Sequence, residues 1–418
     1  MDRGKKMASD LARYTSALLF VIFTSANCWA AQCVREDGSG GCFTSIQAAV
    51  GAAVAGEVIA IYPGNYDEGT GVTVDKNNLQ LVGQGGWPGD VRIQGSAAVV
   101  SLSAPQTRLE NVSVNNSPDG VIVTGANASI VNVRIAGCTG TGITVTANDV
   151  QIATSTIYGI DGAGIVATGN GFSVRSSVVK GTGGNCIEVN GNNATIQANR
   201  VYSCGTQGVL VVGSAARVLE NTLSVAQEAL ILVEGPGPLI RGNQIAGGGN
   251  NAISVDSDSP IVRNNTAMDC ASGINVHCGS CGGGSVSDNV VINSYNSRGF
   301  TIQTGAAGMS VINNQALYCK VHGFEIDGPG MVVQNNRAKN NGSDGFNVGP
   351  GSTGMRLLDN TANVNARDGI RVESGATGTK LRRNRAHNNH HAVDFHDDGT
   401  DTILGSGSDR NYFETTGP

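Results

Sequence analysis

Aromatic and charged residues are scarce in this chain of 418 residues, at 5% and 14% respectively. After the first 30 residues, no apolar run approaches the roughly 18 consecutive residues of a membrane-spanning helix, so we expect no membrane span. The formal net charge of -6 argues against a nucleic-acid partner, which would require a basic stripe. A helical period of 3.6 residues is almost absent as well, which disfavours helix-rich fold classes.

The abundant residues indicate β-structure with many tight turns. Glycine contributes 60 residues. The apolar residues are mostly Val, Ile and Ala, in very short runs separated by Gly and Asn. Short apolar runs bounded by turn residues are typical of strands.

The first 30 residues predict export. Basic residues at positions 3, 5, 6 and 13 precede a short apolar segment over 17–23, and small residues at 28 and 30 predict cleavage after Ala30. Lipid attachment at Cys28 is the alternative, but Asn27 before it fits that poorly. We therefore expect a secreted, periplasmic or cell-envelope protein with a signal peptide over 1–30.

Ten cysteines in an exported chain predict disulfide bonds, because that compartment is oxidising. Cys33 and Cys42 bracket a Gly-rich loop and form the best candidate pair. A second pair is expected within a set of three: Cys270, Cys278 and Cys281. Four cysteines recur at one position of a repeat, and we interpret them as small residues that fill a buried turn: Cys138, Cys204, Cys270 and Cys319.

The repeat is a Gly followed by alternating apolar residues. It recurs mostly every 22 residues, as from Gly120 to Gly142 to Gly164, and stretches to 26 residues between Gly273 and Gly299. The longer step contains an insertion around Cys278. Cys186, Ala229, Ala252 and Ala392 take the place of the Gly in other copies. About a dozen coils of a solenoid are expected from this spacing.

One Asn also recurs in each coil, at intervals of 22 to 25 residues from Asn199 to Asn384. Asn tolerates the left-handed conformation of a sharp bend. Stacked amides at the strand spacing of about 4.8 Å can also form a hydrogen-bonded ladder. We therefore predict a structural role for this Asn series.

The one helical period lies over residues 44–55, where Ile46, Ala49, Val50 and Ala53 share a face and Thr44 is placed to cap the start. A short helix there would cover the open end of the solenoid, which otherwise exposes its core and strand edges. The expected organisation is a signal peptide over 1–30, a cap and first coils over 31–98, and repeats over 99–418.

Two stretches resemble the right-handed parallel β-helix proteins of the pectate-lyase-like superfamily. One runs from Ser45 to Val50 and continues through residues 59–68, and the other is the repeat from about 99 to 410. The resemblance implies an all-β fold, a single-stranded right-handed parallel β-helix with a short N-terminal capping helix. It also implies a substrate groove across the first sheet, although this fold hosts lyases, hydrolases, epimerases, esterases and tailspikes.

Alternation along the first strand of each coil predicts which side chains face outward. The outward positions are apolar or Thr-rich in the N-terminal half, whereas acids, Arg and His gather in the C-terminal half. The candidate catalytic residues are Glu325, Asp327, Arg371, Glu373, Asp394 and His396. Acids on adjacent coils would lie about 5 Å apart, within the range that paired carboxylates use in glycoside hydrolysis.

Roles for single residues follow from their chemistry. Arg371 could hold or neutralise a uronate carboxylate, and His396 or His277 could act as a base. Residues 394–397, Asp-Phe-His-Asp, resemble the Asp-Pro-His motif of alginate epimerases but lack the Pro. A purely structural polar face, in which Arg371 pairs with Glu373 and Asp394, is the alternative.

Metal sites are a further possibility. Four histidines lie close together and could bind a transition metal: His387, His390, His391 and His396. The Asp-rich loop over 397–401 could take calcium. No Cys or Met lies beside the histidines, and arginines at 382, 383 and 385 adjoin them, so the cofactor is left open.

Two functions fit this sequence. The first is an exported protein that binds a carbohydrate polymer along the first sheet and cleaves or epimerises it. The second is a non-catalytic surface or envelope scaffold. Few aromatic residues favour the second, because sugar sites usually stack rings on Trp or Tyr, whereas acids concentrated on one face favour the first.

Overall fold

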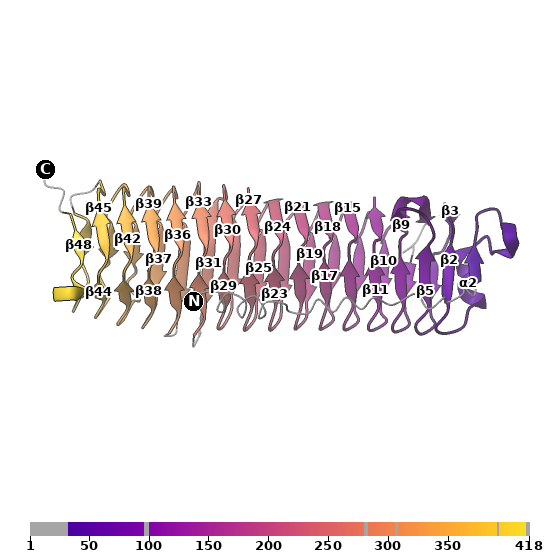
Figure 1. Ribbon diagram of the computed structural model, residues 1–418, viewed down its shortest axis with the longest axis horizontal. Coiled ribbons are helices and arrows are strands. Elements are labelled where there is room, and N and C mark those ends of the chain that lie inside the picture. Colours follow the sequence, from indigo (N-terminus) through magenta and orange to yellow (C-terminus); the bar gives the residue numbers. More distant parts are fainter. Residues whose placement is uncertain (1–31, 96–99, 280–282, 306–307, 391–392, 415–418) are drawn as a thin grey trace, which may run out of the picture.

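The computed structural model describes residues 32–95, 100–279, 283–305, 308–390 and 393–414. They form one elongated rod of stacked coils, a right-handed parallel β-helix (Figure 1). Three parallel sheets run along the rod and contain 17, 15 and 16 strands of the described residues. The predicted fold is confirmed, although the solenoid has about 15 turns and not a dozen. The predicted signal peptide lies outside the described residues.

Each coil contributes one strand to each sheet. A representative coil contains β37 (Phe324–Asp327) in sheet C, β38 (Val332–Gln334) in sheet A and β39 (Arg337–Lys339) in sheet B. Sheet A runs from β1 (Gln32–Val34) to β47 (Ile403–Leu404), and sheet B from β3 (Gly64–Asp67) to β48 (Tyr412–Phe413).

Sheet C corresponds to the first strand of each predicted repeat and therefore carries the predicted site. Its strands, in order along the rod, are β4 (Val72–Val74), β7 (Val100–Leu102), β10 (Val121–Val123), β13 (Ile143–Val145), β16 (Ile165–Ala167), β19 (Ile187–Asn190), β22 (Val209–Val212), β25 (Ile231–Glu234), β28 (Asn251–Asp256), β31 (Ser272–Cys278), β34 (Phe300–Thr304), β37, β40 (Phe346–Val348), β43 (Ile370–Val372) and β46 (Phe395–Asp397).

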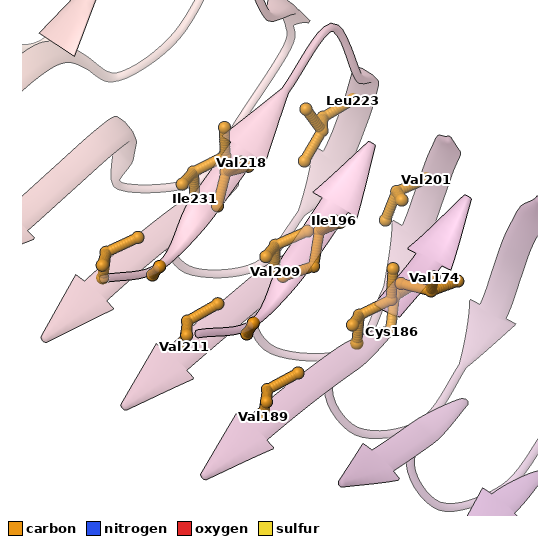
Figure 2. Packing of buried hydrophobic residues seen from close by; sticks show 14 of the residues in the cluster. Val174, Cys186, Val189, Ile196, Val201, Val209, Val211, Val218, Leu223 and Ile231 are labelled. Atoms are coloured by element: carbon orange, nitrogen blue, oxygen red, sulfur yellow. The ribbon is translucent and has the colours of Figure 1, made fainter. Parts of the chain in front are cut away.

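The core is a narrow column of aliphatic side chains that all three sheets supply. Val189 and Val211 of sheet C, Ile196 of sheet A and Val201 of sheet B are fully buried in it (Figure 2). Under the C-terminal half of sheet C the core changes to aromatic rings. Phe324 stacks on Phe300 and Phe346 with ring centroids 4.7 Å and 4.8 Å apart. The face above these rings therefore has a rigid support.

The N-terminal end of the rod is covered by α2 (Ile46–Ala52), the single α-helix of the described residues (Figure 1). The predicted helix is confirmed, but its N-cap is Ser45 and not Thr44. The Ser45 side chain accepts a hydrogen bond from the Ala48 N–H. The carboxylate of Glu68 accepts further bonds from the backbone N–H groups of Ile46 and Gln47, which satisfies donors that a helix start leaves free.

The predicted Asn ladder lies between sheets A and B. In a typical rung, the side-chain amide of Asn314 donates to Val286 O at 2.8 Å and to Asn336 Oδ1 at 3.0 Å. Its Oδ1 accepts from the backbone and side-chain nitrogens of Asn289, both at 3.0 Å. The same pattern extends from Asn199 to Asn411, and serines replace the Asn in earlier coils, as at Ser177.

The reason given above for Asn at this position is only partly right. The left-handed residue in each bend is the one before the ladder, for example Asn313 with φ 58° and Asn335 with φ 55°. Asn313 is exposed, whereas Asn314 is buried. Asn313 thus adopts the left-handed conformation of the turn, and Asn314 makes the buried hydrogen bonds of the ladder.

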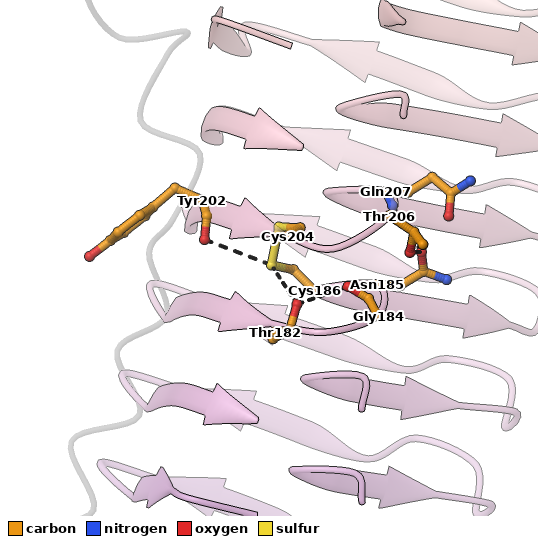
Figure 3. The surroundings of a disulfide bond; sticks show 8 residues. All are labelled: Thr182, Gly184, Asn185, Cys186, Tyr202, Cys204, Thr206 and Gln207. Carbon is orange, nitrogen blue, oxygen red and sulfur yellow. Dashed lines mark hydrogen bonds between the residues drawn. A yellow bond between two sulfur atoms is a disulfide. The ribbon is translucent and has the colours of Figure 1, made fainter. Parts of the chain in front are cut away.

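Two disulfides have both partners among the described residues. Cys33–Cys42 confirms the first predicted pair. Cys186–Cys204 joins the start of β19 to the end of β21 (Arg200–Cys204) (Figure 3). The interpretation of Cys204 as a turn-filling thiol is therefore wrong. Cys278 is also disulfide-bonded, and Cys281 lies outside the described residues.

The other cysteines of that repeat position are free and buried: Cys138, Cys270 and Cys319. Burial raises the pKa of the Cys319 thiol to about 12. These three fit the predicted role as apolar turn fillers, because a protonated thiol in an apolar site is inert.

Candidate functional site

One outward column of side chains runs in register along the C-terminal half of sheet C. Thr301 pairs with Glu325, Glu325 with Asn347, Asn347 with Arg371, and Arg371 with His396. Neighbouring members lie one strand spacing apart, about 4.8 Å. The alternation argument thus placed Glu325 and Arg371 correctly on one face.

The last coil differs from the predicted alignment by two residues. Phe395 pairs with Ile370 and His396 with Arg371, so His396 stands where Asp394 was expected. Asp394 takes the position of Gly369, is 1% exposed, and accepts a hydrogen bond from the Asn389 side chain at 2.8 Å. The expectation that Asp394 faces outward is wrong. A smaller misalignment affects Ala229, because Leu230 takes the Gly position of its coil.

Glu325 and Asp327 of β37 lie on the outer face, in two different environments. Glu325 forms an ion pair with Arg298 from the preceding coil. Asp327 packs against Gly349 and Gly351, where an added Cβ would come within 2.9 Å and 2.6 Å of its side chain. Only residues without a Cβ fit beside the Asp327 carboxylate, which fixes the position of that group.

Arg371 and His396 share two carboxylates. Arg371 Nη2 lies 3.1 Å from Asp398 Oδ2, and Nη1 lies 3.8 Å from Asp368 Oδ2. His396 Nε2 lies 3.1 Å from the same Asp398 oxygen, and its Nδ1 lies 3.6 Å from Asp368 Oδ2. Glu373, the remaining candidate, is not part of this group and accepts a hydrogen bond from Asn347 at 3.0 Å.

A buried carboxylate continues this group toward the N-terminus. Asp344 has no exposed area, and its Oδ2 lies 3.2 Å from His322 Nδ1. Its Oδ1 accepts the Asp368 backbone N–H at 2.9 Å. Burial by itself raises the pKa of Asp344, but the His322 imidazole, the Asp368 N–H and the charge of Arg367 outweigh it and hold that pKa below its ordinary value.

We name this group the carboxylate–histidine cluster. Its members are His322, Asp344, Asp368, Arg371, His396 and Asp398. The analysis of the sequence missed three of these, His322, Asp344 and Asp368, and named Asp398 only within the Asp-rich loop over 397–401. His322, Asp344 and Asp368 each precede the Gly of a repeat. Charged or titratable residues recurring at that position were the signal that could have found them.

The turn before sheet C owes its shape to a second Asn ladder. The Asn341 side chain donates to Asn365 Oδ1 at 2.9 Å, and Asn365 donates likewise to Asn389. Asn341 Oδ1 in turn accepts the backbone N–H of Cys319 at 3.0 Å. The ladder holds the turns that carry Asp344 and Asp368 at a constant height above the sheet.

A polar hollow of about 450 Å³ adjoins the cluster on its N-terminal side. We name it the amide pocket, since most of its lining side chains carry amide or hydroxyl groups. It is lined by Asn250, Asn251, Ala271, Ser272, Asn275, Asn296, Ser297, Arg298, Thr301 and Gln303. Arg298 belongs to this pocket and also pairs with Glu325, so the pocket and the column of charged residues form one continuous surface.

The predicted metal sites find little support in the geometry. Within the described ranges, no group of three or more His, Cys, Asp or Glu side chains could hold a metal ion. His391 lies outside those ranges. In the Asp-rich loop, Asp397 Oδ1 accepts hydrogen bonds from the Gly399 N–H at 3.1 Å and the Thr402 hydroxyl at 3.0 Å. That carboxylate is thus engaged within its own loop.

Comparisons with known proteins agree with the architecture. The family model described as a right handed beta helix region matches residues 66–224, 167–316 and 295–408. The matched segments span most of the chain, and the chain therefore belongs to the right-handed β-helix family. No curated protein sequence matches it.

Solved structures that resemble the chain have low sequence identity to it. The Azotobacter vinelandii mannuronan C-5 epimerase AlgE6 A-module is 16% identical, with a TM-score of 0.37, over 87% of this chain and 94% of that chain. The pectate lyase Pel9A is 14% identical, with a TM-score of 0.38, over 74% and 79%. The Streptococcus pneumoniae surface protein and adhesin PfbA is 11% identical, with a TM-score of 0.39, over 75% and 95%.

Proposed function

We propose that this chain is an exported β-helix protein that binds a polysaccharide along sheet C and cleaves it at the carboxylate–histidine cluster. The observation that carries the proposal is the continuity of the amide pocket with the outward column from Thr301 to His396. Export is supported by the disulfides Cys33–Cys42 and Cys186–Cys204, which are typical of oxidising compartments. No helix of the described residues is long and apolar enough to cross a membrane.

The amide pocket supplies the binding part of this function. Amide and hydroxyl groups donate and accept hydrogen bonds without charge, which suits the hydroxyl groups of a sugar. A linear polymer lying along the rod would pass from the pocket over Glu325 and Asn347 to the cluster. One strand spacing of about 4.8 Å per coil provides a regular series of contacts for it.

The charge balance favours a neutral sugar at the cluster. Arg371 already contacts Asp368 and Asp398, and Arg298 already contacts Glu325. These cations are occupied by carboxylates, so the positive charge that a uronate would need is compensated. We therefore favour hydrolysis of a glycosidic bond over the lyase or epimerase chemistry of a uronate polymer.

The chemical roles follow from position. His396 lies between two carboxylates and is 37% exposed, so it can pass a proton between the cluster and a bound sugar. Asp368 is buried and orients both His396 and Arg371. Asp398 is more exposed and would face the substrate directly.

A panel of neutral glycans and uronate polymers tests the proposal, with binding and the release of reducing ends as readouts. We expect a neutral polysaccharide to bind and to be cleaved. His396→Gln should lower turnover at least 100-fold with little change in binding, whereas the exposed turn residue His390→Gln should behave as wild type. Unsaturated ends from a uronate polymer would instead establish lyase chemistry, and no binding to any member of the panel would favour the scaffold alternative.

A further inference from the structure

Sheet B carries an unusual distribution of charge. From β6 (Val91–Gln94) to β45 (Arg385–His387), no strand of this sheet among the described residues contains Asp or Glu. Seven cations lie on the same strands: Arg92, Arg134, Lys180, Arg200, Arg337, Lys339 and Arg385. In a chain of net charge -6, these consecutive strands therefore carry cations and no acids.

These cations also lack carboxylate partners, unlike many arginines on the other sheets. On sheet A, Arg108 pairs with Glu110 and Arg241 with Glu220, each at 2.8 Å. No carboxylate of the described chain lies within 4.0 Å of Arg134, Lys180 or Arg200. No salt bridge of the described residues therefore neutralises these three cations.

Aromatic rings alternate with these cations in the N-terminal half of the sheet. Tyr158 of β15 (Thr156–Ile160), Lys180 of β18 (Val178–Thr182) and Tyr202 of β21 are in register. Lys180 Nζ lies 5.6 Å from the centre of the Tyr158 ring and 5.5 Å from that of Tyr202. Arg200 adds a further contact at 5.3 Å to Tyr202. Cation–π contacts of this kind hold the side chains in one line.

A large exposed ring extends the line toward the N-terminus. Arg134 donates a hydrogen bond to the Tyr158 hydroxyl, and its guanidinium carbon lies 5.7 Å from the centre of the Trp87 ring. Trp87 is 52% exposed. We name the whole series the cation–aromatic ladder; its members are Trp87, Arg134, Tyr158, Lys180, Tyr202 and Arg200.

The turn that presents Trp87 is built to hold it in place. The Asp90 carboxylate accepts the Trp87 backbone N–H at 3.1 Å. The ring packs directly on Gly89, where a Cβ would lie 2.4 Å from it. Gly85 likewise leaves room for the Asp90 side chain, since a Cβ at position 85 would lie 2.4 Å from it. An exposed Trp fixed by its own loop is a preorganised contact for a partner.

The other end of the ladder is equally well supported. Cys204, two residues after Tyr202, is disulfide-bonded to Cys186, and the Tyr202 ring points away from that bond (Figure 3). Before the ladder, a hollow of about 440 Å³ is lined by Asp67, Gln94 and Asn116, among others. Polar groups thus continue the surface toward the N-terminus of the rod.

We propose that the cation–aromatic ladder is a second binding site of this chain, for an acidic polysaccharide that lies along sheet B. The cations would bind its carboxylate or sulfate groups, and the rings would stack on the apolar faces of its sugars. Tyr158 and Tyr202 are two strand spacings apart, roughly 9.6 Å, a step that suits alternate rings of an extended glycan. This site is separate from sheet C, where the cations are neutralised.

The experiment measures binding of hexagalacturonate by isothermal titration calorimetry at low salt, with the neutral cellohexaose as a second probe. We expect hexagalacturonate to bind at the ladder and to weaken with added salt. Lys180→Gln should weaken it at least 5-fold, and the double variant Tyr158→Ala/Tyr202→Ala at least 10-fold. The matched control is Lys339→Gln, which should change affinity less than 2-fold. Lys339 is a half-buried cation on the same column of sheet B, and its Nζ makes none of the cation–π contacts found among the described residues.

Two further arms separate this site from sheet C and from other partners. Asn275→Ala, in the amide pocket, should leave hexagalacturonate binding unchanged, because the ladder lies on sheet B. The test of the ladder therefore remains valid even if sheet C neither binds nor cleaves a polysaccharide. A loss of cellohexaose binding in Lys180→Gln as large as the loss of hexagalacturonate binding would overturn the proposal. An effect of Lys339→Gln as large as that of Lys180→Gln, or tighter binding of single-stranded oligothymidylate or of phosphatidylglycerol vesicles, would also overturn it. If the aromatic variants unfold, as circular dichroism would reveal, Tyr→Phe at both positions should retain binding within about 3-fold because the rings remain.

Discussion

His322 Nδ1 lies 3.2 Å from Oδ2 of Asp344, a carboxylate with no exposed area. The pair anchors the N-terminal side of the carboxylate–histidine cluster. Because the folded pKa of Asp344 lies below its ordinary value, the ionised carboxylate stabilises the fold, and this contribution is complete above the unfolded pKa of about 3.9. It is lost as the pH falls through the lower, folded pKa.

Asp344→Asn should therefore lower the free energy of unfolding by roughly 2 kcal/mol at neutral pH, since a buried charged hydrogen bond is removed. Chemical denaturation as a function of pH measures this. The difference between variant and wild type should shrink as the pH falls below about 4. Asp398→Asn, on the exposed side of the cluster, should cost at most about 1 kcal/mol. Equal effects of the two substitutions would contradict the structural role given to Asp344.

Asn314→Ala removes hydrogen bonds to Val286, Asn289 and Asn336 from the buried ladder. The expected loss of stability is roughly 2–4 kcal/mol, because several buried backbone and side-chain groups lose their partners at once. Asn313→Gly is the matched control at the neighbouring left-handed position, and it should change stability by only a few tenths of a kcal/mol. Thermal unfolding of both variants gives the comparison, and a full loss of polysaccharide binding without a change in melting temperature would speak against the ladder role.

Phe324 is stacked between two other rings in the core. Phe324→Ala should cost roughly 3–5 kcal/mol, because it opens a cavity beneath Glu325 and removes both stacking contacts. Phe324→Leu fills most of that space and should cost clearly less. Urea denaturation measures both costs, and equal costs for Phe324→Leu and Phe324→Ala would contradict the expectation, because they would mean that the lost ring contacts and not the cavity account for the destabilisation.

The free thiols of Cys138, Cys270 and Cys319 should not react with Ellman's reagent in the native protein at pH 8. Burial raises the pKa of each thiol and blocks access to it. After unfolding in guanidinium without reductant, these thiols should react at once. Rapid labelling of Cys319 in the folded state would show that the turn beside Asn341 opens far more readily than its hydrogen bond suggests.

Most of the fold could be predicted from the sequence, because the fold is periodic. Each coil repeats one Gly and one Asn for a fixed steric or hydrogen-bonding reason, so the spacing of Gly120, Gly142 and Asn314 was enough to define strands, bends and a parallel stack. Periodicity gave no information on which cysteines pair with one another. The Cys186–Cys204 disulfide joins positions that the repeat had assigned to two different roles, and cysteine spacing does not determine connectivity.

The candidate site was predicted in part, for a related reason. Alternation found Glu325 and Arg371, since both lie within regular strands. It misplaced Asp394, because the turn between Asn389 and Phe395 is two residues longer than the alignment assumed, and turn length is not encoded by strand alternation. It also passed over Asp344 and Asp368, whose positions before a Gly look like ordinary turn residues until the second Asn ladder brings them against the sheet.

The coils from β13 to β28 have a uniform length, so distances along this part of the rod are multiples of one strand spacing. In that stretch, neighbouring coils pair residue for residue at a separation of 22, as for Ile143 with Ile165 and Ile165 with Ile187. Removing or duplicating the unit over 209–230, which carries no residue of either proposed binding site, would move everything beyond it along the axis by one strand spacing, about 4.8 Å. Each residue of the Asn ladder would still meet an equivalent neighbour. The distance along the rod between the cation–aromatic ladder and the amide pocket is therefore set by a whole number of coils, and evolution can change it by duplicating or deleting the coil over 209–230.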